Sequence, residues 1–158
     1  MLDSNEYKIS DRYVKNSGSV FLTGVQALAR LPIQQLRADK QRGLNTAAFL
    51  AGYPGSPLAG LNFEIDKAKS LVTDLPIIHR PVLNEEHAAT AVMGSQLAAE
   101  QPDCNYDGIF GLWYGKAPGL DRAGDALRHA VFTGTSRNGG AVAIVGDGPA
   151  AKSSTLPS

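Results

Sequence analysis

Residues 76–96 read PIIHRPVLNEEHAATAVMGSQ, and this stretch decides the fold. Its first part, 76–83, is apolar and interrupted only by polar His-Arg, which predicts a short extended strand. Asn84 then predicts a helix N-cap, and Glu85 and Glu86 suit the positive end of a helix dipole. This favourable interaction with the helix dipole is enough to explain two glutamates in a first helical turn, without any catalytic role. The helix behind them, however, is rich in alanine, glycine and serine, so we expect a buried helix whose first carboxylates are candidates for chemistry.

The same order of strand, turn and helix recurs along the chain. Short apolar runs predict strands, and apolar residues at helical spacing predict the helices between them. The expected strands are 46–53, 77–83, 108–113 and 141–145, and the expected helices are 24–39, 58–71, one from residue 85 and one that ends near residue 129. Pro32 implies either a kink in the first helix or two shorter helices. Strands that alternate with helices are typical of a three-layer α/β/α fold with a mostly parallel sheet, which we therefore expect.

Length and composition predict a single domain. The chain has 158 residues, of which 43% are hydrophobic, enough for one ordinary core. Residues 1–18 are polar, and their apolar residues do not recur at helix or strand spacing. We therefore expect an N-terminal arm that packs on a neighbour or is disordered. The domain would then cover 19–158. Residues 150–158 carry no pattern that ends a domain, so we expect a fold that is incomplete at its C-terminus and belongs to a larger multidomain enzyme.

Charge and cysteine content exclude several classes of function. The 15 basic and 15 acidic side chains balance and form no long block, so neither nucleic acid nor an anionic membrane is an expected partner. The single Cys104 excludes an intrachain disulfide and a cysteine-rich metal site. The three histidines do not share a metal-ligand spacing, so we assign no metal ligand. Without a long apolar run or a secretory signal in the sequence, we expect a cytoplasmic protein.

The loops that follow parallel strands converge on one edge of a sheet, where ligands bind. The polar side chains expected there are Ser56, Glu85, Glu86, Lys116, Arg122 and Asp147. The turn GYPGSP at 52–57 has two interpretations: a simple structural turn, or a turn in which Gly55 lets a ligand approach the backbone and Ser56 donates a hydrogen bond to a carboxylate. Arg122 also has two interpretations: it forms a surface ion pair with Asp121 or Asp125, or its charge is directed at an anionic group of a substrate or cofactor. Lys116 is the other candidate for a cation directed at such a group.

The tripeptide GDG at 146–148 matches the start of a thiamine-diphosphate signature in which the aspartate holds magnesium. That signature requires a downstream pair of asparagines, which this chain lacks. The tripeptide therefore favours a turn that ends a strand.

Four motifs together resemble the thiamine-diphosphate-dependent 2-oxoacid:ferredoxin oxidoreductases, above all the fused-chain indolepyruvate ferredoxin oxidoreductases. They are GYPGSP at 52–57, LNEEHAATAV at 83–92, WYGKAPGLDRAGDA at 113–126, and AIVGD at 143–147 followed by KSST at 152–155. Their order and spacing cover the chain from about Gly18 to its end. The resemblance implies a pyrimidine-binding domain with an α/β fold.

The resemblance also implies roles for individual residues. Glu85, rather than Glu86, would hydrogen-bond N1′ of the cofactor aminopyrimidine and act in catalysis. The residues expected to contact the cofactor are Glu85, Gly55 and Tyr53, and those expected near the substrate are Ser56, Lys116 and Arg122. Pro54 departs from the arginine common in fused-chain relatives, which leaves the identity of the oxoacid open. Met93 replaces a commoner tryptophan.

The resemblance further implies partners for this chain. Magnesium, iron–sulfur clusters and a diphosphate-binding domain would lie in the rest of the enzyme or in another subunit. The expected reaction is oxidative decarboxylation of an aryl 2-oxoacid such as indolepyruvate to an acyl-CoA, with ferredoxin as acceptor and a homo-oligomeric enzyme. The isolated chain would be inactive. Two alternatives stay open: a non-catalytic relic or dimerisation domain of the same fold, and a thiamine-dependent decarboxylase or synthase without redox chemistry.

Overall fold

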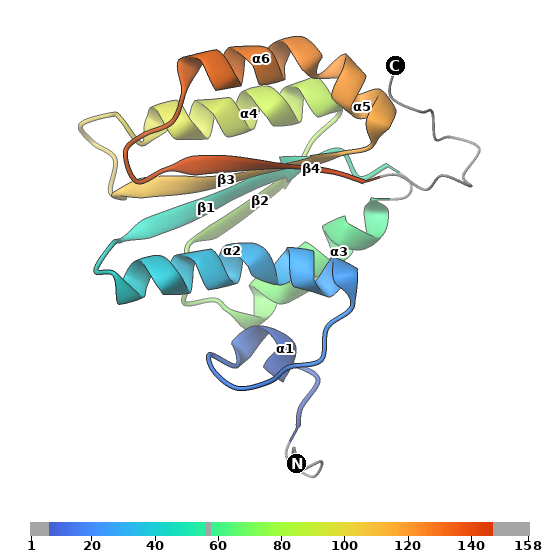
Figure 1. Ribbon diagram of the computed structural model, residues 1–158, viewed down its shortest axis with the longest axis vertical. Helices are drawn as coiled ribbons and strands as arrows, with labels where there is room; N and C mark the ends of the chain where they lie inside the picture. The colour runs from blue at the N-terminus through green and yellow to red at the C-terminus, as the bar shows by residue number, and fades with distance from the viewer. Residues whose placement is uncertain (1–6, 56–57, 147–158) are drawn as a thin grey trace.

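The computed structural model describes residues 7–55 and 58–146. These residues form an alternating series of helices and strands (Figure 1). In chain order the elements are α1 (Asp11–Val14), α2 (Gly24–Gln41), β1 (Thr46–Gly52), α3 (Ala59–Leu71), β2 (Ile77–Pro81), α4 (Glu85–Ala98), β3 (Gly108–Gly115), α5 (Ala117–Arg122), α6 (Gly124–Thr133) and β4 (Gly140–Val145). The strand and helix series predicted from the sequence is therefore confirmed, with two exceptions: α1 lies in the stretch expected to be an arm, and two helices, α5 and α6, follow β3 where one was expected.

The strands form one parallel sheet in the order β2-β1-β3-β4. Helices α2 and α3 cover one face, with α1 outside them, and α4, α5 and α6 cover the other (Figure 1). This arrangement is a three-layer α/β/α fold, as the sequence predicts. Parallel sheets need cover on both faces, because their crossover connections place helices on both sides.

Each strand divides its side chains between the two faces, because successive residues point in opposite directions. Leu50, Leu112 and Tyr114 lie in a core with residues of α2 and α3. Ala51 and Trp113 lie in a second core, which includes Ala88 and Ala89 of α4. The small side chains of α4 thus let this helix lie close to the sheet, as its composition predicts.

Local signals explain where the two longest helices begin. Thr23 caps α2 with a capping box: its side chain accepts from the backbone N–H of Gln26, and the Gln26 side chain accepts from the backbone N–H of Thr23. The helix then runs as one element through Pro32, so the alternative of two shorter helices is wrong. Asn84 caps α4 as expected, since its Oδ1 accepts from the backbone N–H of His87 at 2.9 Å.

The polar N-terminal stretch packs against its own domain over the residues described. Tyr13 is fully buried in the core beside α2 and α3, and its hydroxyl donates to Glu64 at 2.5 Å. Arg30 of α2 donates from its guanidinium to the backbone oxygens of Arg12 and Lys15, which stabilises the end of α1. Arg37 of α2 also donates to the backbone oxygens of Val14 and Lys15, so the buried Tyr13 ring and two guanidinium groups hold this segment against the domain.

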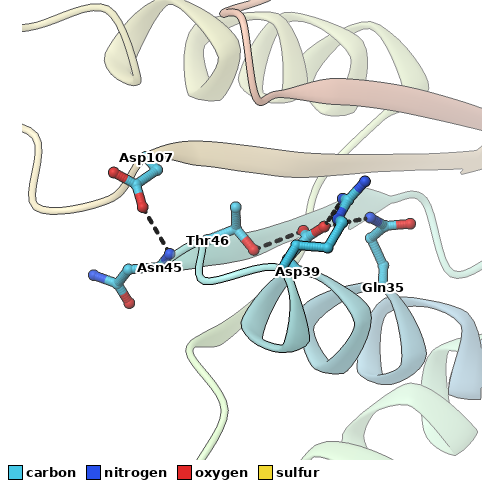
Figure 2. Close-up of polar contacts among 6 residues, drawn as sticks. Gln35, Asp39, Asn45, Thr46 and Asp107 are labelled. Carbon is cyan, nitrogen blue, oxygen red and sulfur yellow. Dashed lines mark hydrogen bonds and ion pairs between the residues drawn. The ribbon is translucent and has the colours of Figure 1, made fainter.

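A buried carboxylate joins the end of α2 to the start of β1 (Figure 2). Asp39 accepts from the hydroxyl of Thr46 at 2.7 Å and from the side chain of Gln35 at 2.9 Å, and it pairs with Arg42. Asp107 accepts from the backbone N–H of the neighbouring Asn45 at 2.7 Å. These contacts lie where β1 and β3 begin, at the opposite edge of the sheet from the loops considered below, so we assign them a structural role.

Among the helices of the described residues, none is both long enough and apolar enough to cross a lipid bilayer.

Candidate active site

The carboxyl edge of the sheet contains a topological switch point between β1 and β3. These strands are neighbours, but β1 connects through α3 to β2 on one side, whereas β3 connects through α5 and α6 to β4 on the other side. The two connections also lie on opposite faces of the sheet (Figure 1). Ligands of open α/β folds bind where adjacent connections diverge in this way. The turn after β1 and the residues after β3 flank this point.

Glu85 is the first residue of α4, and its position is set by β3. The indole Nε1 of Trp113 donates to the backbone oxygen of Glu85 at 3.0 Å, a buried hydrogen bond. Glu85 itself is only 8% exposed. Across residues 7–55 and 58–146, we find no group that donates a hydrogen bond to its carboxylate. Packing and the backbone therefore hold this side chain.

Gly119 in α5 provides the space for the carboxyl group of Glu85. A β-carbon built at residue 119 would lie 2.5 Å from both Cγ and Oε1 of Glu85. Real β-carbons do not approach other heavy atoms that closely, so a side chain at this position would require the carboxyl group to move. Gly119 is not among the site residues expected from the sequence, where it is only one of several glycines that follow β3.

Glu86 and Arg122 form an ion pair on the surface. Nε of Arg122 lies 3.4 Å from Oε2 of Glu86, and their side chains are 60% and 50% exposed. The aspartates considered as partners of Arg122 do not fill that role in the described structure, where Asp125 instead lies beside His129 at 3.7 Å. Exposed pairs of this kind contribute about 0–1 kcal/mol. The two adjacent glutamates thus occupy different environments, one buried and one paired in solvent.

The turn after β1 is closed by an aromatic ring. A β-carbon at Gly55 would lie 2.8 Å from Cε1 of Tyr53, so glycine allows the Tyr53 ring to fold over the turn. Tyr53 remains 39% exposed. Ser56, expected to contact substrate, lies outside the described residues, as do Asp147 of the GDG tripeptide and the KSST motif.

Lys116 follows β3 and precedes α5, on the other side of the switch point. The strand end that carries it is fixed to β4, because the backbone N–H of Gly146 donates to Gly115 at 3.0 Å. The ring of Trp113 covers Gly115, where a β-carbon would lie 2.5 Å from Cη2. The structure therefore places Lys116 at the same edge of the sheet as Glu85 and Tyr53.

Two hollows formed by the described residues lie away from Glu85, Tyr53 and Lys116. One of about 520 Å³ is lined by residues that include Asp66, Ile77 and Tyr106, and one of about 640 Å³ includes Arg37 and Lys40. Neither contains Glu85, Tyr53 or Lys116.

Within the described ranges, no three side chains of the His, Cys, Asp or Glu types gather as metal ligands. Comparison with known proteins adds no relative: no protein-family model, no curated protein and no solved structure matches this chain.

Proposed function

We propose that this chain is the pyrimidine-binding half of a thiamine-diphosphate site in a 2-oxoacid oxidoreductase. The observation that carries the proposal is the environment of Glu85. Glu85 is largely buried, its backbone oxygen accepts from Trp113, its carboxyl group lies against Gly119, and that group accepts no hydrogen bond from the described residues. Its oxygens are not among the fully buried, unpartnered atoms of the described residues, so a ligand can reach them and supply a hydrogen bond.

The residues at the carboxyl edge fit this cofactor. Glu85 would hold a proton between its carboxyl group and the aminopyrimidine ring, and the partly exposed Tyr53 ring offers a flat apolar surface at the same edge of the sheet. Thiamine diphosphate, when bound, supplies an electron sink for decarboxylation of a 2-oxoacid. Lys116 and Ser56 are the candidates for the substrate carboxylate. Arg122 joins them only if its ion pair with Glu86 opens.

The finer assignment rests on the sequence motifs. They favour oxidative decarboxylation of an aryl 2-oxoacid such as indolepyruvate to an acyl-CoA, with ferredoxin as acceptor, in the cytoplasm. Magnesium, iron–sulfur clusters and the diphosphate-binding surface would come from the rest of the enzyme or another subunit of a homo-oligomer.

A titration tests the proposal. Thiamine diphosphate with magnesium is titrated calorimetrically into the chain alone and into the chain mixed with the diphosphate-binding part of the same enzyme. We expect binding only in the mixture. Tight binding to the chain alone would indicate a self-contained site, and no binding in either sample would contradict the proposal.

Glu85→Gln tests the catalytic residue. It preserves the size of the side chain, so we expect an intact fold with turnover lower by about a hundredfold or more, the scale of a general acid–base contribution. Glu86→Gln is the matched control: it changes the adjacent, exposed carboxylate and is expected to keep turnover near that of the wild type. The reverse order of effects would assign the role to Glu86.

A non-catalytic interaction domain is the second candidate, because α6 exposes two large apolar side chains. Val131 is 83% exposed and Phe132 is 95% exposed. Side chains of this kind mark contact surfaces when they lie together. Failure to bind the cofactor in the mixture, together with stable association of the two parts, would favour this function. A thiamine-dependent decarboxylase or synthase would bind the cofactor but reduce no ferredoxin.

A further inference from the structure

A chain of polar contacts is buried between α3 and the sheet, on the face opposite Glu85. Nδ1 of His79 lies 2.7 Å from Oδ1 of Asp66, and Nε2 lies 2.8 Å from the hydroxyl of Tyr114. That hydroxyl also donates to Oδ1 of Asn62 at 2.9 Å. The His79 side chain is fully buried, whereas that of Asp66 is 55% exposed. This series of polar contacts therefore runs from the surface of α3, through β2, to the end of β3.

The ring of Tyr114 lies across Gly52, the last residue of β1. Gly52 and Tyr114 are partners in the register of the two strands. A β-carbon at residue 52 would overlap the ring, so glycine is required where the ring crosses β1. The backbone oxygen of Gly52 also accepts from the N–H of Val82 at 3.2 Å. The position of one ring thus affects the ends of β1, β2 and β3 together.

We propose that Tyr114, held by His79 and Asn62, is a positioning residue for the candidate active site. Its hydroxyl contacts fix the tilt of the ring, and the ring fixes how far the end of β1 lies from the end of β3. These two ends carry the turn with Tyr53 and the residue Lys116. The role of Tyr114 in ligand binding rests on the proposed function, whereas its effect on the strand ends does not.

Tyr13 offers a matched control for a purely structural role. It is as fully buried as Tyr114, lies in the same core, and also donates a hydrogen bond from its hydroxyl, to Glu64. It belongs to α1, however, which lies beyond α2 and α3 from the sheet (Figure 1). Removal of either hydroxyl should weaken the core, but only Tyr114 should affect the carboxyl edge.

The first measurement is amide hydrogen exchange in the full chain, for Tyr114→Phe and Tyr13→Phe. We expect exchange at the N–H of Val82 to be about tenfold faster in Tyr114→Phe, which loses the hydroxyl contacts to His79 and Asn62, and unchanged in Tyr13→Phe. Global unfolding in urea corrects both variants for overall stability. Equal exchange at Val82 in the two corrected variants would overturn the proposal. Asn62→Ala, which keeps the ring and the His79 contact, should give a smaller increase and replaces Tyr114→Phe if that variant does not fold.

The second measurement is titration of thiamine diphosphate with magnesium into each variant mixed with the diphosphate-binding part. We expect about tenfold weaker binding for Tyr114→Phe and wild-type binding for Tyr13→Phe. Equal affinity in both variants would overturn the role in ligand binding. If the wild-type mixture does not bind the cofactor, the proposed function fails, and hydrogen exchange at Val82 still decides whether Tyr114 positions the strand ends.

Discussion

The carboxyl group of Glu85 occupies the space beside Gly119 that any larger residue would fill, since a β-carbon there would lie 2.5 Å from its Oε1. The two residues belong to different helices, α4 and α5, on the same face of the sheet. The backbone of Glu85 is meanwhile fixed by the Trp113 indole. The direction of this carboxyl group is therefore set by side-chain packing as well as by its place at the start of α4.

Gly119→Ala should displace the carboxyl group of Glu85. We expect a loss of about 1–3 kcal/mol in the free energy of unfolding, as for other overpacked sites. Cofactor binding by the reconstituted enzyme should weaken more than this loss of stability accounts for. Urea unfolding and calorimetric titration measure the two effects.

Gly124→Ala is the control for Gly119→Ala. The nearest atom to a β-carbon at residue 124 is Nη1 of Arg128 at 3.7 Å, an ordinary contact. This variant should bind the cofactor as the wild type does. If both alanine variants bind equally, Gly119 does not determine the position of Glu85.

Trp113→Phe should separate the start of α4 from β3. The phenyl ring keeps most of the apolar contact but cannot donate to the Glu85 oxygen, which leaves a buried acceptor without its partner. We expect the free energy of unfolding to fall by about 1–3 kcal/mol. Denaturant unfolding followed by circular dichroism measures this change, and Glu85→Gln, which leaves the backbone oxygen paired, should lose much less stability. Equal losses would argue against the indole contact.

Gly52→Ala should be poorly tolerated because the overlapping Tyr114 ring is buried and bound through its hydroxyl. We expect a loss of about 1–3 kcal/mol in the free energy of unfolding. Gly60→Ala in α3 provides the contrast, since a β-carbon there has no neighbour within 4 Å. Alanine is favoured over glycine inside a helix by roughly 0.5–1 kcal/mol, so this variant should be stabilised. Thermal and urea unfolding of both variants distinguish the expected loss of stability in Gly52→Ala from the expected gain in Gly60→Ala.

Stability should fall at alkaline pH because two buried tyrosines resist ionisation. Burial raises the pKa of Tyr13 and of Tyr114 above the ordinary value of 10.0, with further increases from Glu64 and Asp66 respectively. Below pH 10 both phenols are protonated in the folded and the unfolded chain, so their contribution to stability is fully present. Above pH 10 the unfolded chain loses these protons first, so unfolding becomes easier by at most about 1.4 kcal/mol per pH unit for each tyrosine.

Urea unfolding between neutral and alkaline pH measures this decline. Tyr114→Phe should lose stability less steeply above pH 10 than the wild type, because one of the two phenols is absent. An identical slope for the two proteins would show that Tyr114 ionises in the folded state as it does in the unfolded chain.

The secondary structure of this protein follows from local sequence patterns. Apolar runs of strand length, helical periods, the Asn84 cap and the turn glycines depend on neighbouring residues, and they predict the parallel α/β/α fold without knowledge of distant contacts. Pro32 is an exception: the proline allowed two interpretations, and only the packing of α2 against the sheet and α3 keeps this helix continuous. The polar N-terminal stretch is a second exception. Tyr13 is buried, but one aromatic residue in a largely polar segment forms no repeating apolar pattern from which its burial could be predicted.

The candidate site was only partly predictable from the sequence. The convergence of Glu85, Tyr53 and Lys116 on one edge follows from parallel strands, a property that the sequence by itself determined. The strand order, the burial of Glu85 but not Glu86, and the pairing of Arg122 with Glu86 depend on which helices lie side by side. Tertiary structure alone decided these features, because Gly119, Trp113 and Tyr114 act on residues that are distant in the chain, and local patterns report only on neighbours.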